Sequence, residues 1–277
     1  MGLFGFIGSV VSCVARGIGS AISSLCSGIG GLLSSAVSGF AGALGVVGAT
    51  IGLAPLQVVV AAVVVVSKLA EALGLKKEME DEPDELAMKA ECADKKPEDF
   101  DTTEEYINYL HKEIKLDIEQ QERLRKMSPD QRSAYQLTGS YLYLKASAEK
   151  LGLDDTTINN STDIKGLDPQ FILDSYKLGL SGEEIVSYIK NMQKQGINDT
   201  KCMSDYLHNK AESIETANKV LDAIVYTIKE NNPSISEDGI DEKINDTNYD
   251  TYMSDANIII ASGNFFAFKV TNVNNSL

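Results

Sequence analysis

Gly8-Ser-Val-Val-Ser-Cys-Val-Ala-Arg-Gly-Ile18 is followed by Gly19-Ser-Ala-Ile-Ser-Ser-Leu-Cys-Ser-Gly-Ile29 and by Gly30-Gly-Leu-Leu-Ser-Ser-Ala-Val-Ser-Gly-Phe40, and these three rows of eleven residues align. A fourth row, Ala41 to Ile51, keeps the apolar positions but loses the serines. Eleven residues in three turns correspond to about 3.67 residues per turn, which is close to the α-helical period. The repeat therefore predicts a helix whose faces recur from row to row.

The predicted helix has two unlike faces when the rows are projected at about 98° per residue. One face is apolar and carries the valine, isoleucine, leucine and phenylalanine side chains of each row, such as Val10, Ile22 and Phe40. The opposite face holds every serine of the three rows and the one charged residue: Ser9, Ser12, Arg16, Ser20, Ser23, Ser24, Ser27, Ser34, Ser35 and Ser38. We expect this polar face to line a water-filled lumen if the helices assemble in a bilayer.

Glycines form the two borders between these faces and continue into the fourth row. Each glycine inside a helix costs up to about 1 kcal/mol relative to alanine, so their regular spacing needs a purpose. Small residues let helix backbones approach closely, and borders on both flanks favour a ring of identical helices. The predicted helix-packing residues are Gly8, Gly17, Gly19, Gly28, Gly30, Gly39, Gly42, Gly45 and Gly48.

The stretch from Gly2 to Ser67 leaves several interpretations open. As one helix it would be about 100 Å long, far longer than one bilayer, so it either folds back between Gly39 and Pro55 or forms a long helix in a tube. A purely apolar helical hairpin is the main alternative to an assembled barrel. A flexible linker, a signal peptide and an N-myristoylation site fit less well, because the apolar positions are regular and Phe6 occupies the place of the required serine or threonine.

Charged residues are distributed very unevenly along the chain of 277 residues. The net charge is −15, yet Arg16 is the only charged residue up to Ser67, so the remainder carries −16. An acidic chain repels the phosphate backbone, which argues against nucleic acid as a partner. The four cysteines and two histidines are too dispersed for a metal site, and we expect no metal and no cofactor.

Past residue 77 the sequence becomes polar and then helical. We expect a hydrophobic membrane-inserting or oligomer-forming segment at 1–77, an acidic linker at 78–101, a soluble helical domain at 102–232 and a tail at 233–277. Helix starts are predicted at Thr102 or Thr103, at Ser128, at Asp168 and at Ser181, because a capping side chain precedes an apolar periodic run at each. An apolar stripe from Tyr106 to Leu124 predicts one helix, and a second stripe predicts one long helix from 199 to about 230.

The tail ends in two β-prone runs around Ser262-Gly263-Asn264. This pattern predicts a β-hairpin at 258–270, which needs a partner because an isolated hairpin is marginal in water. The partner is the helical domain, a second subunit or the sheet edge of another protein. The predicted fold class is therefore all-α, with a long glycine- and serine-rich N-terminal helix or helical hairpin, an acidic helical domain and a small C-terminal β-hairpin.

Met1 to Ile7, with glycine alternating with bulky apolar residues, resembles the start of a viral fusion peptide, and its membrane-inserting candidates are Leu3, Phe4, Phe6 and Ile7. The N-terminal quarter as a whole resembles glycine-zipper pore-forming proteins. That resemblance implies a homo-oligomeric membrane-penetrating protein, either a secreted toxin or effector or a viral or phage entry or ejection component. Its partners would be a lipid membrane and its own copies, and it would be secreted or virion-associated before insertion and membrane-associated afterwards.

The alternative function is a structural assembly protein in which the same helices form a tube, filament or shell core without a bilayer. No enzyme signature is present in the sequence: the glycines lack the lysine of a phosphate-binding loop, and no nucleophile elbow occurs. We therefore expect no catalytic residue.

Overall fold

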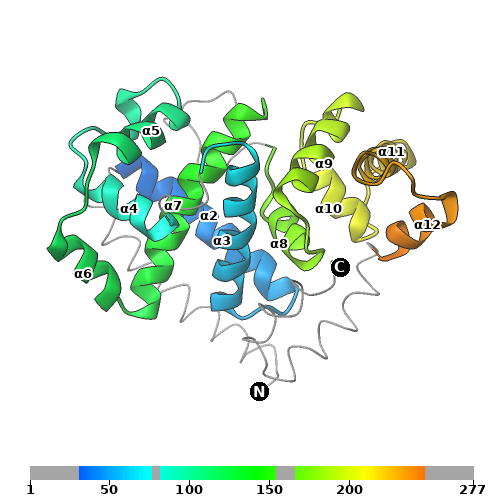
Figure 1. The fold of residues 1–277 in the computed structure, drawn as a ribbon. Coiled ribbons are helices and arrows are strands. Elements are labelled where there is room, and N and C mark those ends of the chain that lie inside the picture. Colours follow the sequence, from blue (N-terminus) through cyan, green and yellow to red (C-terminus); the bar gives the residue numbers. More distant parts are fainter. Residues whose placement is uncertain (1–30, 77–81, 154–165, 247–277) are drawn as a thin grey trace, which may run out of the picture. The chain divides into compact units, whose positions relative to one another are not determined.

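The computed structural model describes residues 31–76, 82–153 and 166–246, and within these ranges the secondary structure is helical throughout (Figure 1). The elements are α2 (Gly31–Thr50), α3 (Pro55–Ala72), α4 (Pro83–Cys92), the 3₁₀ helix η1 (Pro97–Asp99), α5 (Thr103–Glu113), α6 (Ile118–Lys126), α7 (Pro129–Lys150), α8 (Pro169–Lys177), α9 (Gly182–Lys194), α10 (Lys201–Leu207), α11 (Ile214–Asn231) and α12 (Glu237–Asp246). The chain divides into two compact units, Met1–Lys201 and Cys202–Leu277. In the second unit α11 contacts α12.

Helix α7 is the core of the first unit. It contacts α3, α4 and α5, and every residue from Leu137 to Ala148 is buried. Gly139 is the point of closest approach to α4, because a Cβ atom at this position would meet the carbonyl oxygen of Pro83. A helix that is buried on all sides needs neighbours on all sides, and α7 obtains them from segments that precede it in the sequence.

Helix α3 is the second buried element, and it packs against α2, α7, α8 and α9. It begins at Pro55, which has no backbone N–H to lose at a helix start. Its buried residues are Val58, Val59, Ala61, Ala62, Val65, Val66, Leu69 and Ala70. At its C-terminal end the backbone of Lys68 lies so close to Gly182 of α9 that no side chain fits between them. Helix α3 is therefore an integral part of the helical core.

The predicted fold class is wrong in its arrangement. Among the residues that the structure describes there is no strand, and the hairpin predicted at 258–270 lies outside them. The apolar stretch is also not a separate element, because α3 packs into the same unit as α7, α8 and α9. Within the predicted linker, residues 83–92 form α4, which packs against α7. The physical reason is that an apolar helix face is covered as well by other helices as by lipid.

The predicted helix starts are confirmed where a side chain caps the backbone. The hydroxyls of Thr102, Ser128 and Ser181 each accept a hydrogen bond from the third residue that follows, and the Asp168 carboxylate accepts one from the Gln170 N–H. Such bonds satisfy donors that the first helical turn leaves free. They are local, which is why the sequence alone reveals them.

The two long helices predicted from apolar stripes are wrong. Residues 114–117 separate α5 from α6, and Asp117 caps a new helix there. Residues 208–213 separate α10 from α11, with Asn209 in the left-handed region at φ 55° and Ser213 as the new cap. In both stripes a capping residue, Asp117 or Ser213, begins a new helix inside the run that was predicted to be continuous. Helix α12 occupies part of the predicted tail.

Candidate functional site

Helix α2, the last part of the repeat, has two unlike faces in the structure. Ser35, Ser38, Gly39 and Gly42 are exposed along one side. The opposite side is buried and consists of Leu33, Ala36, Val37, Phe40 and Leu44. The ring of Phe40 lies 5.9 Å from that of Tyr141 on α7, measured between centroids. The buried face of α2 thus belongs to the core, and its outer face carries small uncharged residues.

The turn between α2 and α3, at 51–54, is flanked by large apolar side chains in water. Val46 is 70% exposed, Leu56 is 49% exposed and Val60 is 40% exposed. We call these three residues the apolar corner. Other exposed large hydrophobic residues that the structure describes, Ile118, Ile214 and Tyr226, lie singly on other helices. Single exposed apolar residues are ordinary on soluble proteins, and these three differ from the others in flanking one turn within an uncharged stretch.

Many of the predicted site residues lie outside the described residues. They are Leu3, Phe4, Phe6, Ile7, Gly8, Ser9, Ser12, Arg16, Gly17, Gly19, Ser20, Ser23, Ser24, Ser27, Gly28 and Gly30. Of Ser34 only the backbone is described, as part of α2. Their assignment to helix packing, to a polar face or to membrane insertion stays a prediction.

The described glycines of the repeat differ in their surroundings. Nothing lies within 4 Å of the position that a Cβ would take at Gly42 or Gly45. At Gly48 a Cβ would meet the Val58 side chain of α3. Gly48 therefore serves a contact within the chain, while Gly42 and Gly45 leave room for another helix. That a copy of this chain fills that room stays a prediction.

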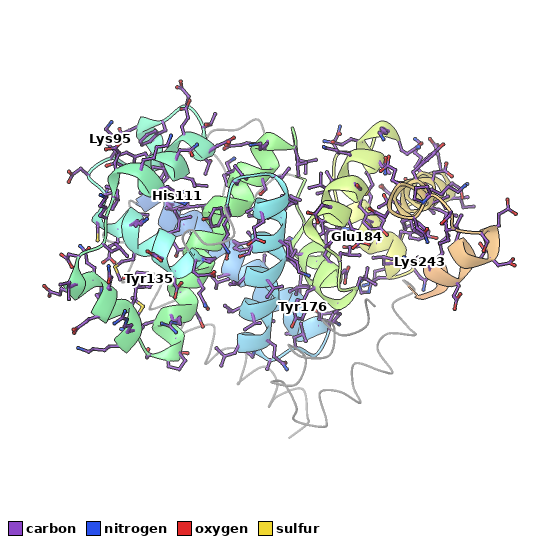
Figure 2. The ribbon with its side chains drawn as sticks, viewed as in Figure 1. Lys95, His111, Tyr135, Tyr176, Glu184 and Lys243 are labelled. Carbon is purple, nitrogen blue, oxygen red and sulfur yellow. The ribbon has the colours of Figure 1, made fainter. Side chains whose placement is uncertain are left out.

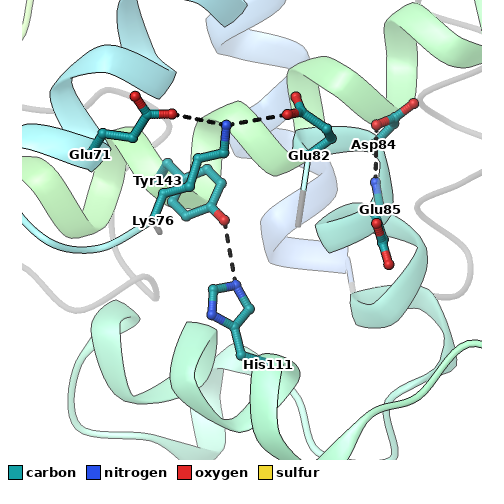
Figure 3. Close-up of polar contacts among 7 residues, drawn as sticks. All are labelled: Glu71, Lys76, Glu82, Asp84, Glu85, His111 and Tyr143. Carbon is teal, nitrogen blue, oxygen red and sulfur yellow. Dashed lines mark hydrogen bonds and ion pairs between the residues drawn. The ribbon is translucent and has the colours of Figure 1, made fainter. Parts of the chain in front are cut away.

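Two lysines contact other parts of the chain at the C-terminal end of α3. The Lys68 Nζ donates a hydrogen bond to the Leu180 carbonyl oxygen at 3.0 Å, between α8 and α9. The Lys76 Nζ lies 3.2 Å from Glu71 Oε1 and 3.4 Å from Glu82 Oε1 (Figure 3), and its side chain is only 5% exposed. A buried ammonium group requires paired charges, so this bridge ties the end of α3 to the start of α4.

A tyrosine–histidine pair lies where α5 meets α7 (Figure 3). The hydroxyl of the buried Tyr143 is 3.4 Å from the Nε2 atom of His111. Six residues further along α7, Glu149 accepts hydrogen bonds from the Thr103 N–H at 2.9 Å and from the Thr103 hydroxyl at 2.7 Å. Glu149 is also 3.9 Å from the buried Lys145 ammonium group. These contacts join the start of α5 to the end of α7.

A third polar cluster joins α4, α6 and α7 around Tyr135 (Figure 2). The Tyr135 hydroxyl donates to Glu91 Oε2 at 2.5 Å, and Arg123 donates to Tyr135 and to Glu91. Burial, and then the hydrogen bond to Glu91, raise the pKa of Tyr135 above its ordinary value. Burial and Glu91 likewise raise the pKa of the neighbouring Cys92 thiol. The hydrogen bonds among Tyr135, Arg123 and Glu91 join α4, α6 and α7.

Sequence reasoning missed these polar clusters because their members are far apart along the chain. The one sequence feature that points to them is Lys76, a lysine at the end of an apolar run. A lysine in that place is equally typical of the boundary of a membrane-spanning helix, so it does not by itself predict an ion pair between helices. In the described ranges no group of three or more histidine, cysteine, aspartate or glutamate residues is placed to hold a metal ion.

One helix among the described residues, Pro55–Ala72, is long and apolar enough to cross a membrane, and 44% of it is buried inside the protein. A core helix of a soluble protein meets the same criterion, so this finding alone is weak evidence. Comparison of the chain with protein families, with curated proteins and with solved structures gave no match.

Proposed function

We propose that this protein is a homo-oligomeric membrane-penetrating protein whose glycine-edged N-terminal repeat enters a bilayer while the helical unit around α7 stays in water. The observation that supports this most is the apolar corner, because Val46, Leu56 and Val60 are exposed within a stretch, Gly31 to Ser67, that has no charged side chain. A charged residue at the centre of a bilayer costs about 2.5–3.5 kcal/mol or more. The stretch therefore avoids the main cost of insertion.

The two apolar helices, α2 and α3, have different roles in this proposal because only α3 is anchored on several sides. Helix α3 is held by α7, α8 and α9 and by the Lys68 hydrogen bond, whereas α2 keeps one face free. The 20 residues of α2 reach about 30 Å, which matches the hydrocarbon thickness. In this proposal the repeat through α2 enters the membrane, and α3 is the tether that joins it to the helical unit.

Dye release from liposomes tests the proposal with the full-length protein. Leucine in place of Gly19 or Gly30 should block close approach of neighbouring helices, and a packing loss of about 1.4 kcal/mol would lower association about tenfold. We expect Gly19→Leu and Gly30→Leu to lose oligomers and dye release together. Ser23→Ala, on the predicted lumen face, is the matched control and should keep both. Absence of leakage by the unaltered protein under every assembly condition would contradict the proposal.

A second function is favoured by the burial of α3. Because the most apolar helix of the chain is covered by protein, the free face of α2 can serve close packing in a filament, tube or shell core with no lipid present. The two functions differ in whether large particles form without a membrane or detergent.

A further inference from the structure

We infer that the turn between α2 and α3 is a lipid-binding surface whose apolar corner inserts shallowly into a bilayer without net charge. This inference rests on the proposed function and deepens it, because it names the residues that make the first contact with the membrane. It depends on the hydrogen bonds of the turn, on the absence of charge around it and on the small area of the corner.

The turn satisfies its backbone donors without water. The N–H groups of residues 51–53 donate to carbonyl oxygens at the end of α2, at 3.1, 3.3 and 2.8 Å. Gly52 makes this closure possible because its φ of 74° lies in the left-handed region. The Ala54 N–H donates to Gln57 Oε1 at 2.8 Å, and the next residue, Pro55, has no N–H. A segment that enters lipid must satisfy these donors internally, and this turn already does so.

The polar side chains of the turn are also bonded to its own backbone. Thr50 and Gln57 are the two polar residues between positions 46 and 60. The Thr50 hydroxyl donates to the Val46 carbonyl oxygen at 3.0 Å, and Gln57 accepts from the Ala54 N–H. Because an unpaired polar group is costly to remove from water, both bonds lower the cost of moving this turn into lipid.

Charge is absent from both helices for some distance beyond the turn. No residue of α2 is charged, and the first charged residue of α3 is Lys68. Lys68 follows Leu56 by 12 residues, or about 18 Å along the helix axis. Interfacial segments enter a bilayer to a depth of about 5–10 Å. Insertion of the corner to that depth therefore leaves the Lys68 ammonium group outside the lipid.

The size of the corner favours lipid over a protein partner. A fully exposed valine or leucine side chain presents about 60–120 Å² of apolar surface, as its transfer free energy per unit area implies. Three such side chains present less than about 360 Å², whereas a stable protein interface needs roughly 800 Å² from each partner. The net charge of −15 opposes association with a second copy or with anionic lipid. The occupant is therefore a bilayer without net charge, such as phosphatidylcholine.

A single introduced tryptophan can report this contact, because the chain contains none. In the full-length protein, Leu56→Trp and Val46→Trp each place the reporter in the corner. Tyr226→Trp on α11 is the matched control, since Tyr226 is 54% exposed against 49% for Leu56. Each variant is mixed with phosphatidylcholine vesicles whose acyl chains are plain or brominated, and bromine quenches only a tryptophan that enters the acyl region.

We expect brominated vesicles to quench the tryptophan at position 46 or 56 several times more strongly than the one at 226. Its emission should also shift to shorter wavelength, and adding anionic phosphatidylglycerol to the vesicles should weaken the effect. Equal quenching at positions 56 and 226 would overturn the inference. So would a tryptophan at 56 that acrylamide cannot reach before lipid is added, because protein would then cover the corner.

The hydrogen bonds of the turn are tested by a second pair of full-length variants. Gln57→Ala removes the acceptor of the Ala54 N–H, a loss that water compensates and lipid does not. We expect binding to phosphatidylcholine vesicles to weaken about tenfold, with little change in urea unfolding. Thr50→Val removes a hydroxyl without freeing a donor, so it should bind at least as tightly as the unaltered protein. Equal binding by the two variants would show that the turn stays in water.

Dye release from the same vesicles separates this inference from the proposed function. If the tryptophans in the corner are quenched but the dye stays inside, the lipid contact stands and the proposed function fails. If the dye is released while neither tryptophan is quenched, the proposed function stands and the lipid contact is refuted. Vesicles that neither quench nor leak would refute both.

Discussion

Individual glycines decide where helices of this protein touch. At Gly139 the backbone of α7 meets the Pro83 carbonyl of α4, and at Gly182 the start of α9 meets the Lys68 carbonyl of α3. Neither position was among the predicted packing glycines, because neither belongs to the repeat. Glycine is needed at these two positions for the reason that we predict in the repeat, since a side chain would hold the backbones apart.

Gly139→Ala should destabilise the protein by about 1–3 kcal/mol, because the added methyl group must displace backbone rather than a flexible side chain. Urea unfolding measures the change. Ser140→Ala, the adjacent position on α7, is the matched control. The buried Ser140 hydroxyl has no hydrogen-bond partner in the part of the chain that the structure describes, so its loss should be neutral or slightly stabilising. Equal destabilisation by both changes would contradict the close contact.

Asp168 gives a pH dependence whose sign follows from its burial. Burial raises the pKa of Asp168, and although the hydrogen bond from the Gln170 N–H opposes this, the nearby Asp199 carboxylate adds to it. The folded state therefore holds the proton more tightly than the unfolded state, so this stabilising contribution is present below the unfolded pKa and is lost as the pH rises through the folded pKa.

Asp168→Asn keeps a capping oxygen and removes the titration. We expect the variant to gain stability relative to the unaltered protein as the pH rises from about 3 to about 6, the range around the ordinary aspartate pKa. Urea unfolding at both pH values measures the difference. A stability difference that does not change with pH, or that changes in the opposite direction, would show that burial does not control this carboxyl group.

Helices α2 and α3 have similarly apolar sequences but differ in how much of their surface other helices cover. Helix α3 is covered by α7, α8 and α9, while α2 leaves one side to solvent. The end of α3 is secured by Lys68 and Lys76. Release of α3 from the core would therefore have to break these polar contacts as well as the apolar packing.

Lys68→Met keeps the apolar stem and removes the hydrogen bond to the Leu180 carbonyl oxygen. The expected loss of about 1 kcal/mol should speed hydrogen exchange at the α3 amides about fivefold, if they exchange through release of this helix. The control is Lys126→Met on α6, whose ion pair with Glu122 is exposed at 76% and 53% and should contribute little. Unchanged exchange in Lys68→Met would show that apolar packing alone holds α3.

At the scale of the whole molecule the chain combines an uncharged stretch with an acidic helical remainder. A net charge of −16 beyond Ser67 opposes association of copies in water, whereas close packing of helices is what we predict for the repeat. Under the proposed function, the balance between these two tendencies would differ between water and a membrane.

Sedimentation of the full-length protein with and without detergent distinguishes the two proposed functions. A membrane-penetrating protein should be monomeric or aggregate irregularly in water and form oligomers of defined size in detergent or liposomes. A structural assembly protein should form large regular particles without either. Regular particles in plain buffer, visible by electron microscopy, would refute the membrane proposal and support the alternative.

The sequence by itself determined the local features of this protein. The caps at Thr102, Ser128, Asp168 and Ser181 follow from hydrogen bonds that span two or three residues, and the two-faced character of α2 follows from its period. Only the tertiary structure decided that α3 belongs to the core, that α4 packs on α7 and that Tyr135 meets Arg123 and Glu91. The physical reason is that an apolar helix face requires only the exclusion of water, and its residues do not specify whether lipid, another copy or a distant part of the same chain excludes it.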